Sequence, residues 1–260
     1  MLAPQRRSLI MERIRRTGAV RVAELVDDLG VSDMTVRRDL ENLAEAGLIA
    51  KVHGGATAVD IGSTDEPGFA AKSVREQAAK EAIARAAAGF VTPGQAIALS
   101  GGTTTWTLAQ HLTGIADLTV VTNSVPVADV FYRTGRRDQT VILTGGIRTP
   151  SDALVGPFAQ ATLETANVDT LFLGVHGISA EGFTTPNIEE SETNRALIRS
   201  ARRLVVLADS TKWEVVGIRT IARCDQADVL ICDTGLPEAA RRVFNEHVGR
   251  LVLAEPKETV

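Results

Sequence analysis

Residues 32–43 read SDMTVRRDLENL and have the pattern of a helix with one apolar and one polar face. Val36, Leu40 and Leu43 recur at the spacing that places them on one side of a helix. Ser32 is suited to cap this helix, because its hydroxyl can accept from the free amides of the first turn. Arg38 falls almost opposite the apolar side. The polar face therefore suits phosphate oxygens and base edges, although an ordinary surface helix fits these residues too.

The chain on either side of this helix predicts a helix-turn-helix followed by a hairpin. Residues 23–29 predict a short preceding helix, which Gly30 can end by taking a positive φ. Apolar residues at helical spacing predict an earlier helix over residues 6–17. Residues 48–56 alternate in character and contain a Gly-Gly pair that allows a tight reversal. Three helices followed by a short basic hairpin form a winged helix, which is a DNA-binding fold.

Several short motifs in this part of the chain point to one known family. They are Val31-Ser32-x-x-Thr35, Arg37-Arg38-Asp39-Leu40, Gly47-Leu48 and His53-Gly54-Gly55-Ala56. In order and spacing they resemble the N-terminal domain of the DeoR family of bacterial transcriptional repressors. The resemblance covers residues 6–56, and it implies a set of DNA-contacting residues. These are Ser32, Thr35, Arg37 and Arg38 in the helix, with Lys51 and His53 in the wing near the DNA backbone.

Length and composition predict two globular domains joined by a linker. The chain has 260 residues, of which 44% are hydrophobic. We expect a small domain over residues 1–58, a linker rich in Gly, Pro and small polar residues over 59–72, and a larger domain over 73–260. No apolar run approaches the ~20 residues of a membrane-spanning helix, and the start lacks the apolar core of a signal peptide. A cytoplasmic protein without membrane contact is therefore expected.

The cysteines and the net charge limit the kinds of site. Cys224 and Cys232 are the only cysteines, and neither belongs to a CxxC pair or a histidine cluster. They predict core packing, with no metal site, disulfide or cofactor. The net charge is −4, and residues 1–58 carry nine Lys/Arg against eight Asp/Glu. Non-specific affinity for DNA should therefore be modest. Two DNA-binding domains in a dimer would supply the positive charge that one domain lacks.

From residue 73 onward, short apolar strands alternate with helices. Strands are expected near residues 96–99, 118–121, 141–143, 170–173, 204–207, 229–232 and 251–253. A helix is expected over residues 73–90, and another runs from the loop at 100–105 through residue 112. Further helices are expected near residues 125–132, 158–165, 189–201 and 238–248. This alternation is typical of an α/β fold with a mostly parallel sheet covered on both faces.

Three loops that follow these strands are built alike from small polar residues. Ligands of such sheets bind at the carboxyl ends of the strands, where helix starts present free amides. The loops suit a phosphate with hydroxyls, hence a sugar phosphate, although a plain tight turn could explain any one of them. No GxxxxGK[ST] motif is present, so a nucleoside triphosphate is not expected. The candidate effector-binding residues in the loops are Ser100, Gly101, Gly102, Thr103, Thr104, Thr122, Asn123, Ser124, Gly145 and Gly146.

Three more polar residues follow strands elsewhere in this domain. Asp209 could accept from sugar hydroxyls and Lys212 could neutralise a phosphate. A turn cap and a solvated lysine are the plain alternatives for these two residues. His176 is interpreted as a hydrogen-bonded structural residue and not as a catalytic base.

Motifs in this domain also resemble the DeoR family. They are Leu99-Ser100-Gly101-Gly102-Thr103-Thr104, Val121-Thr122-Asn123-Ser124, Thr144-Gly145-Gly146, Leu173-Gly174-x-x-Gly177-Ile178 and Ala208-Asp209-Ser210-x-Lys212. They are similar to the family's sensor domain, which resembles ribose-5-phosphate isomerase in fold and senses a phosphorylated sugar. Ser100 and His176 stand where the family often has Asp, which argues against residual catalysis. Asn194-Arg195 stands where Lys-Arg is frequent.

Three hypotheses follow for the function. The first is a sequence-specific repressor of a carbohydrate-metabolism operon, a homodimer or homotetramer that binds operator DNA under the control of a phosphorylated sugar and is not an enzyme. The second is an enzyme similar to a sugar-phosphate isomerase with a DNA-binding head, which would need a base beside a carbonyl group. The third is a DNA-binding protein with a vestigial pocket, for which no ligand should have an effect.

Overall fold

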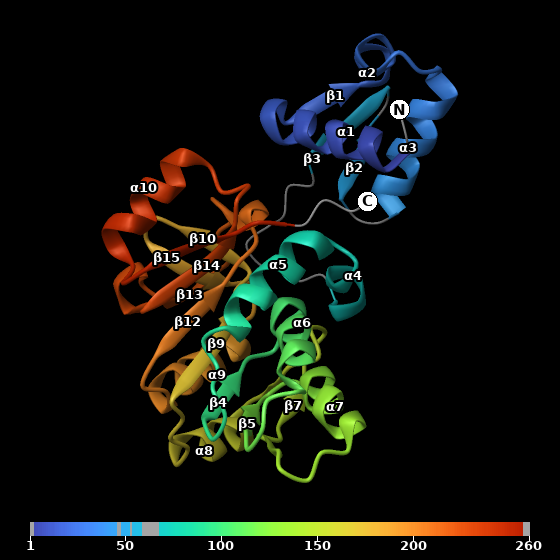
Figure 1. Ribbon diagram of the computed structural model, residues 1–260. Helices are drawn as coiled ribbons and strands as arrows, with labels where there is room; N and C mark the ends of the chain where they lie inside the picture. Colours follow the sequence, from blue (N-terminus) through green and yellow to red (C-terminus); the bar gives the residue numbers. More distant parts are fainter. Residues whose placement is uncertain (1–2, 46–47, 53, 59–67, 257–260) are drawn as a thin grey trace. The chain divides into compact units, whose positions relative to one another are not determined.

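The computed structural model describes residues 3–45, 48–52, 54–58 and 68–256. The chain forms two compact units, Met1–Gly62 and Ser63–Val260 (Figure 1). Each unit has its own hydrophobic core, and each is described here by itself. Among the described residues, none of the helices combines the length and the apolar character needed to cross a membrane.

The first unit has the predicted winged helix-turn-helix architecture. Its elements are α1 (Ala3–Thr17), β1 (Ala19–Arg21), α2 (Val22–Leu29), α3 (Asp33–Glu45), β2 (Ile49–Val52) and β3 (Gly55–Ala58). The hairpin β2–β3 is confirmed, but β1 was not predicted, and it pairs antiparallel with β3 to complete a sheet of order β1-β3-β2. Buried Ile10, Leu25, Val36, Leu40 and Ile49 join the three helices to this sheet.

Two glycines allow the tight connections of this unit. Gly30 has φ 62°, and its amide donates to the Val26 carbonyl, so the turn between α2 and α3 closes as expected. A Cβ at Gly55 would lie 2.0 Å from the carbonyl oxygen of Val20. Only glycine therefore lets β1 approach the hairpin.

The second unit is built on a seven-stranded sheet. Its strands are β4 (Ala96–Leu99), β5 (Thr119–Thr122), β6 (Thr140–Leu143), β9 (Thr170–Gly174), β12 (Leu204–Leu207), β14 (Val229–Asp233) and β15 (Leu251–Ala254). Their order is β15-β14-β12-β9-β4-β5-β6, and every neighbouring pair is parallel. The predicted α/β fold with a mostly parallel sheet is therefore confirmed.

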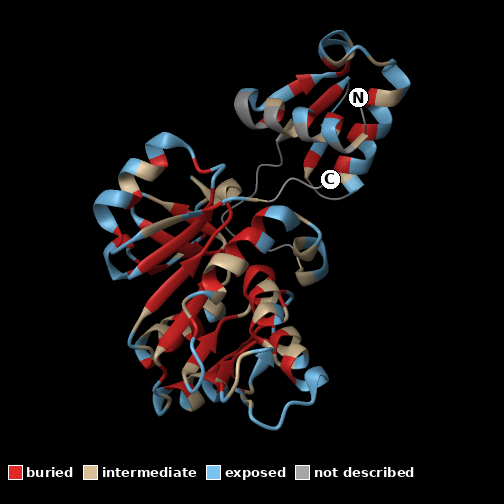
Figure 2. Ribbon diagram, in the orientation of Figure 1, coloured by how far each residue is buried: buried red, intermediate tan, exposed pale blue. Residues whose placement is uncertain are grey.

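Helices cover both faces of this sheet. Their bounds are α4 (Phe69–Ser73), α5 (Gln77–Ala88), α6 (Thr103–Leu112), α7 (Val125–Thr134), α8 (Pro157–Glu164), α9 (Ile188–Ser200) and α10 (Glu238–His247). Alternate residues of β9 point to opposite faces, so Leu171 and Leu173 pack in the core with α8, α9 and α10, and Phe172 packs with α5, α6 and α7. Figure 2 shows the strands buried between the two helical layers, whose outer sides are exposed.

Several small elements of this unit were not predicted. A hairpin of β7 (Ile147–Arg148) and β8 (Leu154–Val155) follows β6, and an antiparallel sheet contains β10 (Gly177–Ser179), β11 (Gly182–Thr185) and β13 (Arg219–Ala222). The 3-10 helices η1 (Ser210–Lys212) and η2 (Cys224–Gln226) follow β12 and β13. Helix α4 lies where a linker was expected. Cys224 and Cys232 are buried in the core, as predicted.

Candidate functional site

Helix α3 presents the polar face that the sequence predicts. Val36, Leu40 and Leu43 are buried, whereas Met34 is 79% exposed and Arg38 is exposed. The Ser32 Oγ accepts from the Thr35 amide at 3.3 Å and lies 2.8 Å from the Thr35 Oγ1. Ser32 therefore caps the helix, and the two hydroxyls are held side by side at its exposed start.

The two candidate arginines of α3 differ in their surroundings. The Arg37 Nε donates to the Asp33 carboxylate at 2.5 Å, and this hydrogen bond raises the pKa of Arg37 still further. No hydrogen bond or ion pair of Arg38 is found in the described part of the chain. The Arg38 guanidinium is therefore available to a ligand without first leaving a partner, whereas Arg37 would have to leave Asp33.

The wing is tied to the far half of the same helix. The Lys51 Nζ lies 2.9 Å from the Glu41 carboxylate, and this hydrogen bond lowers the pKa of Glu41. His53 lies outside the described residues. The exposed Lys51 thus sits beside α3, but its charge is shared with Glu41.

A buried ion pair fixes α3 against α1. The Arg6 Nε lies 2.5 Å from the Asp39 carboxylate, and both side chains are at least nine-tenths buried. The sequence placed Asp39 in a family motif but gave it no role. Its spacing of three residues from Val36 and four from Leu43 is a local signal that it shares their buried face.

The second unit contains a cavity of about 90 Å³ at the carboxyl ends of β4 and β9. Five of the expected effector-binding residues line it, namely Gly101, Gly102, Thr103, Thr104 and Lys212. The lining residues that were not expected are Lys72, Ser151, Gly174, Val175, His176, Thr185, Pro186, Glu190 and Asn194.

Glycines shape the start of α6 at this cavity. A Cβ at Gly101 would lie 2.6 Å from the Cβ of Ala153, and Gly102 has φ 151°. The chain can therefore pass close to the loop before β8 and then begin the helix at Thr103. The first amides of a ten-residue helix consequently face the cavity, with the positive end of the helix dipole behind them.

The remaining expected loop residues support the cavity without lining it. The Asn123 side chain accepts from the Gly101 amide at 2.8 Å and donates to the Leu154 carbonyl. The Ser100 Oγ accepts from the Gly174 amide at 3.0 Å. Thr122 donates to the Leu99 carbonyl, and Ser124 caps α7. These small polar groups satisfy backbone atoms at the strand ends, which is why they are buried and lie outside the cavity lining.

Gly145, Gly146 and Asp209 also lie outside the cavity lining. A Cβ at Gly146 would lie 2.4 Å from the carbonyl oxygen of Val155, so this glycine serves the close approach of the hairpin β7–β8. Asp209 is buried and accepts from the Thr211 hydroxyl. Its carboxylate lies 3.8 Å from the Lys212 Nζ, so Asp209 acts on the cavity through Lys212.

Two lysines with different surroundings lie near one another here. The Lys212 Nζ donates to the Val175 carbonyl at 2.5 Å. Lys80 is buried in α5 and donates to the carbonyls of Lys72 and Arg75 at 2.5 and 2.6 Å. Burial, and to a smaller extent the charge of Lys212, lowers the pKa of Lys80 to about 8. Lys80 and Lys212 therefore place two amines beside the cavity, and the Asp209 carboxylate opposes their charge.

Comparison with known proteins identifies both units. Residues 6–61 match the DeoR-like helix-turn-helix domain, and residues 75–234 match the DeoR C terminal sensor domain. The chain belongs to the DeoR family. Its helix-turn-helix match contains all six expected DNA-contacting residues. Its sensor-domain match contains the cavity lining except Lys72, which precedes it in α4.

Similar DeoR-family proteins match almost the whole chain. The chain is 34% identical to the HTH-type transcriptional regulator YgbI of Escherichia coli strain K12, over 98% of this chain and 99% of that protein. It is 33% identical to the putative aga operon transcriptional repressor of Escherichia coli O157:H7, over 90% of this chain and 87% of that protein. It is 34% identical to the HTH-type transcriptional regulator GlpR of Haloferax volcanii, over 93% of this chain and 94% of that protein. These relatives are transcriptional regulators.

A solved D-ribose-5-phosphate isomerase, in complex with phospho-erythronic acid, is also similar to this DeoR-family chain. The sequence identity is 16% and the TM-score is 0.40. The likeness covers 53% of this chain and 54% of the isomerase.

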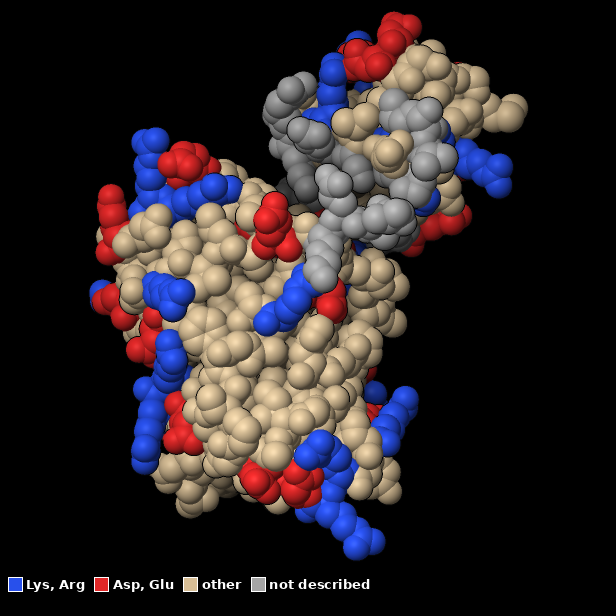
Figure 3. Space-filling view, in the orientation of Figure 1, with Lys and Arg blue, Asp and Glu red and all other residues tan. Residues whose placement is uncertain are grey.

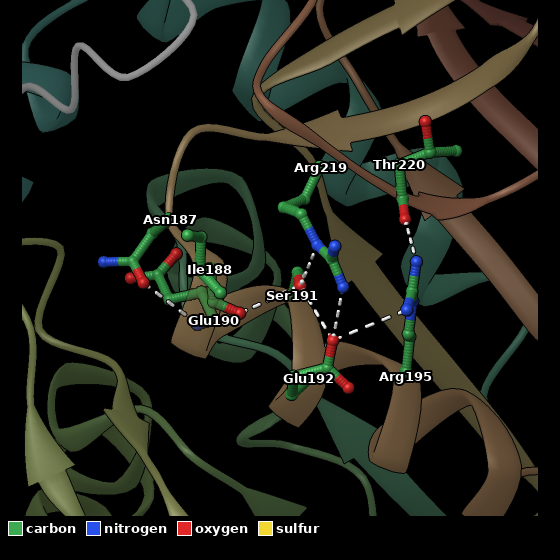
Figure 4. Close-up of polar contacts among 8 residues, drawn as sticks. All are labelled: Asn187, Ile188, Glu190, Ser191, Glu192, Arg195, Arg219 and Thr220. Atoms are coloured by element: carbon green, nitrogen blue, oxygen red, sulfur yellow. Dashed lines mark hydrogen bonds and ion pairs between the residues drawn. The ribbon is translucent and has the colours of Figure 1, made fainter.

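Helix α9 supplies two cavity residues that the sequence did not reveal, Glu190 and Asn194. The Glu190 carboxylate accepts from the hydroxyls of Thr149 and Ser151, which hold the loop before β8 at the cavity. The amide oxygen of Asn187 caps α9 by accepting from the Glu190 amide (Figure 4). The spacing of four residues places Glu190 and Asn194 on one side of a helix, but nothing in the sequence says that this side faces the loop at Gly101.

Proposed function

We propose that this DeoR-family protein is a repressor of a carbohydrate-metabolism operon, and that a phosphorylated sugar bound in the cavity controls its binding to operator DNA. The observation that carries the proposal is the composition of the cavity. The helix-start residues of α6 and Lys212 of η1 line it, together with the Glu190 carboxylate and the Asn194 amide of α9. The first set suits a phosphate and the second suits hydroxyls.

On the DNA side, α3 would enter the major groove with its exposed N-terminal half. Arg38 is the first candidate for a base or phosphate contact, with Ser32 and Thr35 beside it and Arg37 joining after it exchanges Asp33. Lys51, and His53 if the wing follows the family pattern, would contact the backbone. A homodimer or homotetramer would place two such helices in successive major grooves of chromosomal DNA in the cytoplasm.

The charged surface of the second unit agrees with this division of roles. On the face of this unit drawn in Figure 3, Lys and Arg side chains are interspersed with Asp and Glu, and neither sign of charge forms a continuous patch. A DNA-binding face would instead concentrate one sign of charge. This face of the second unit is therefore not expected to bind DNA.

On the effector side, the expected residues divide into two groups. Gly101, Gly102, Thr103, Thr104 and Lys212 would contact the ligand. Ser100, Thr122, Asn123, Ser124 and Asp209 would position the contacting groups, and Gly145 and Gly146 would shape the neighbouring hairpin. The sensor domain would begin at α4 and not at residue 73, because Lys72 already lines the cavity.

We also propose that the cavity senses its ligand without transforming it. An isomerase would need a base free to remove a proton beside a carbonyl group. The carboxylate in the cavity, Glu190, already accepts two hydroxyl hydrogens. Its arrangement suits the holding of a loop and of ligand hydroxyls.

The test uses the full chain and an operator selected by the protein from random duplex DNA. Fluorescence anisotropy would measure operator affinity with a series of sugar phosphates and with their parent sugars, and thermal unfolding would measure binding of the same compounds. A sugar phosphate that raises the melting temperature and weakens operator binding, while its parent sugar does neither, is the expected result. Ligands that bind without changing operator affinity would contradict control by the cavity, and the absence of any binding would leave the vestigial-pocket hypothesis.

A further inference from the structure

Asn194 is a buried amide that faces the cavity. Asn194 is 8% exposed and lines the cavity from α9. None of the hydrogen bonds found among the described residues uses its side chain, in contrast to Glu190 one turn earlier. The residue is largely buried, but its amide atoms keep some contact with solvent, because they are not among the fully buried side-chain atoms that lack a hydrogen-bond partner. The Asn194 amide is therefore a group that a ligand can satisfy.

The other side of α9 is held firmly, so Asn194 is presented from a fixed platform. The Glu192 carboxylate lies 2.8 Å from Arg219 and 3.4 Å from Arg195, and the hydrogen bond from Arg219 lowers the pKa of Glu192. Arg195 also donates to the Thr220 carbonyl of β13 at 2.6 Å. Figure 4 shows these side chains converging on one another, with Glu190 apart from them beside Asn187. The helix cannot easily turn to give Asn194 a protein partner.

The charges around the cavity match one anionic group. Lys72 and Lys212 line it, and Lys212 is partly neutralised by Asp209 at 3.8 Å. On the α9 side the cavity has the carboxylate of Glu190 and the neutral amide of Asn194. A second anionic group on the ligand would meet a like charge at Glu190, whereas a hydroxyl could both donate to and accept from these two residues.

We propose that Asn194, together with Glu190, makes the cavity selective for sugars with a single phosphate and excludes sugar bisphosphates. This inference rests on the proposed function, since it takes the ligand to be a phosphorylated sugar. The inference adds that Glu190 and Asn194 of α9 recognise uncharged hydroxyls of the sugar, and that these two residues set the selectivity. A ligand hydroxyl would hydrogen-bond the Asn194 amide in place of solvent.

The test compares matched pairs of ligands by titration calorimetry on the full chain. The probes are inorganic phosphate, ribose 5-phosphate with ribulose 1,5-bisphosphate, and fructose 6-phosphate with fructose 1,6-bisphosphate. The protein should bind at least one monophosphate about tenfold more tightly than its bisphosphate, the size of effect expected for one lost charge-assisted contact. Asn194→Leu replaces the amide by an apolar side chain of similar size. It should weaken binding of the sugar monophosphate about tenfold and binding of inorganic phosphate much less.

Two charge variants then test the selectivity itself. Asn194→Lys and Glu190→Gln should each raise the affinity for the bisphosphate relative to the monophosphate, and Glu190→Gln keeps an oxygen that can accept from Thr149 and Ser151. If Asn194→Lys fails to fold, Glu190→Gln still decides the question. Gln110→Lys, on the exposed side of α6, adds the same charge away from the cavity and should leave the ratio unchanged.

The outcomes separate this inference from the proposed function. Failure of inorganic phosphate and of every phosphorylated sugar to bind would overturn both. Equal or tighter binding of the bisphosphates, or a ratio that neither charge variant changes, would overturn the inference and leave the sugar-phosphate sensor standing. Binding of inorganic phosphate with no gain from any sugar would also overturn it, because the hydroxyl contacts would then contribute nothing.

Discussion

Replacing Lys212 by methionine tests how the cavity is held together. The substitution keeps the aliphatic stem and removes the ammonium group, which donates to the Val175 carbonyl and lies 3.8 Å from Asp209. The Asp209 side chain is 4% exposed, so after the substitution it would be a buried charge with a hydroxyl as its partner. Removing one member of a buried ion pair costs about 3–5 kcal/mol. The Lys212 side chain is 21% exposed, which admits water and places the expected loss at about 2 kcal/mol.

For a domain of this size, a loss of that magnitude lowers the melting temperature by about 4–8 °C, which differential scanning calorimetry would measure. The same variant should weaken binding of the effector phosphate about 10- to 100-fold, the value of one charge-assisted hydrogen bond. The double variant Lys212→Met/Asp209→Asn removes the unpaired charge as well. It should therefore be more stable than Lys212→Met alone, by about 1 kcal/mol or more.

Two results would refute this reasoning. If the destabilisation by Lys212→Met and that by Asp209→Asn simply add in the double variant, the ammonium group does not compensate the buried carboxylate. If Lys212→Met binds the sugar phosphate as tightly as the unmodified protein, the phosphate lies elsewhere in the unit.

Three other predictions concern separate parts of the chain. Arg38→Ala should weaken operator binding about 5- to 100-fold, and Arg37→Ala should weaken it less, because Arg37 starts from an ion pair. Fluorescence anisotropy over a range of salt concentrations would measure both effects. A larger effect at Arg37 would contradict the assignment. The pKa of Lys80, at about 8, lies below its ordinary value of 10.5. Between pH 8 and 10 the Lys80 side chain is therefore protonated in the unfolded chain but largely neutral in the folded protein. This difference should make the free energy of unfolding rise by about 1 kcal/mol from pH 7 to 9. Urea unfolding of Lys80→Met should lack this contribution to the rise. Gly101→Ala should abolish effector binding and lower the melting temperature, because its Cβ would lie 2.6 Å from that of Ala153, and the added change Ala153→Gly should partly restore both.

Local sequence patterns predicted the helices and strands whose signals lie within one element. The caps and apolar spacing of α3 are an example, since Ser32, Val36 and Leu40 lie within nine residues of one another. Strand β1 was missed because its three residues acquire a partner only in β3, more than thirty positions later. Helix α4 was missed because five residues after a stretch rich in Gly and Pro carry too little periodicity, and it is the contact between Phe69 and Trp106 that helps to hold it in place.

The cavity was only partly predictable for a related reason. Small polar residues at a strand end look the same in sequence whether they bind a ligand or the backbone. Asn123 and Gly101 follow neighbouring strands, yet Asn123 hydrogen-bonds the Gly101 amide while Gly101 lines the cavity. Glu190 and Asn194 could not be placed at all, because only the packing of α9 brings its N-terminal turns to the loop at Gly101.

Helix α4 carries Lys72 into the cavity although none of its five residues is buried. It is secured by the edge contact of Phe69 with Trp106 and by the Lys72 carbonyl, which accepts from the buried Lys80. A ligand phosphate in contact with Lys72 would add to these few interactions, so effector binding would stabilise α4 against local unfolding more than it stabilises the rest of the unit.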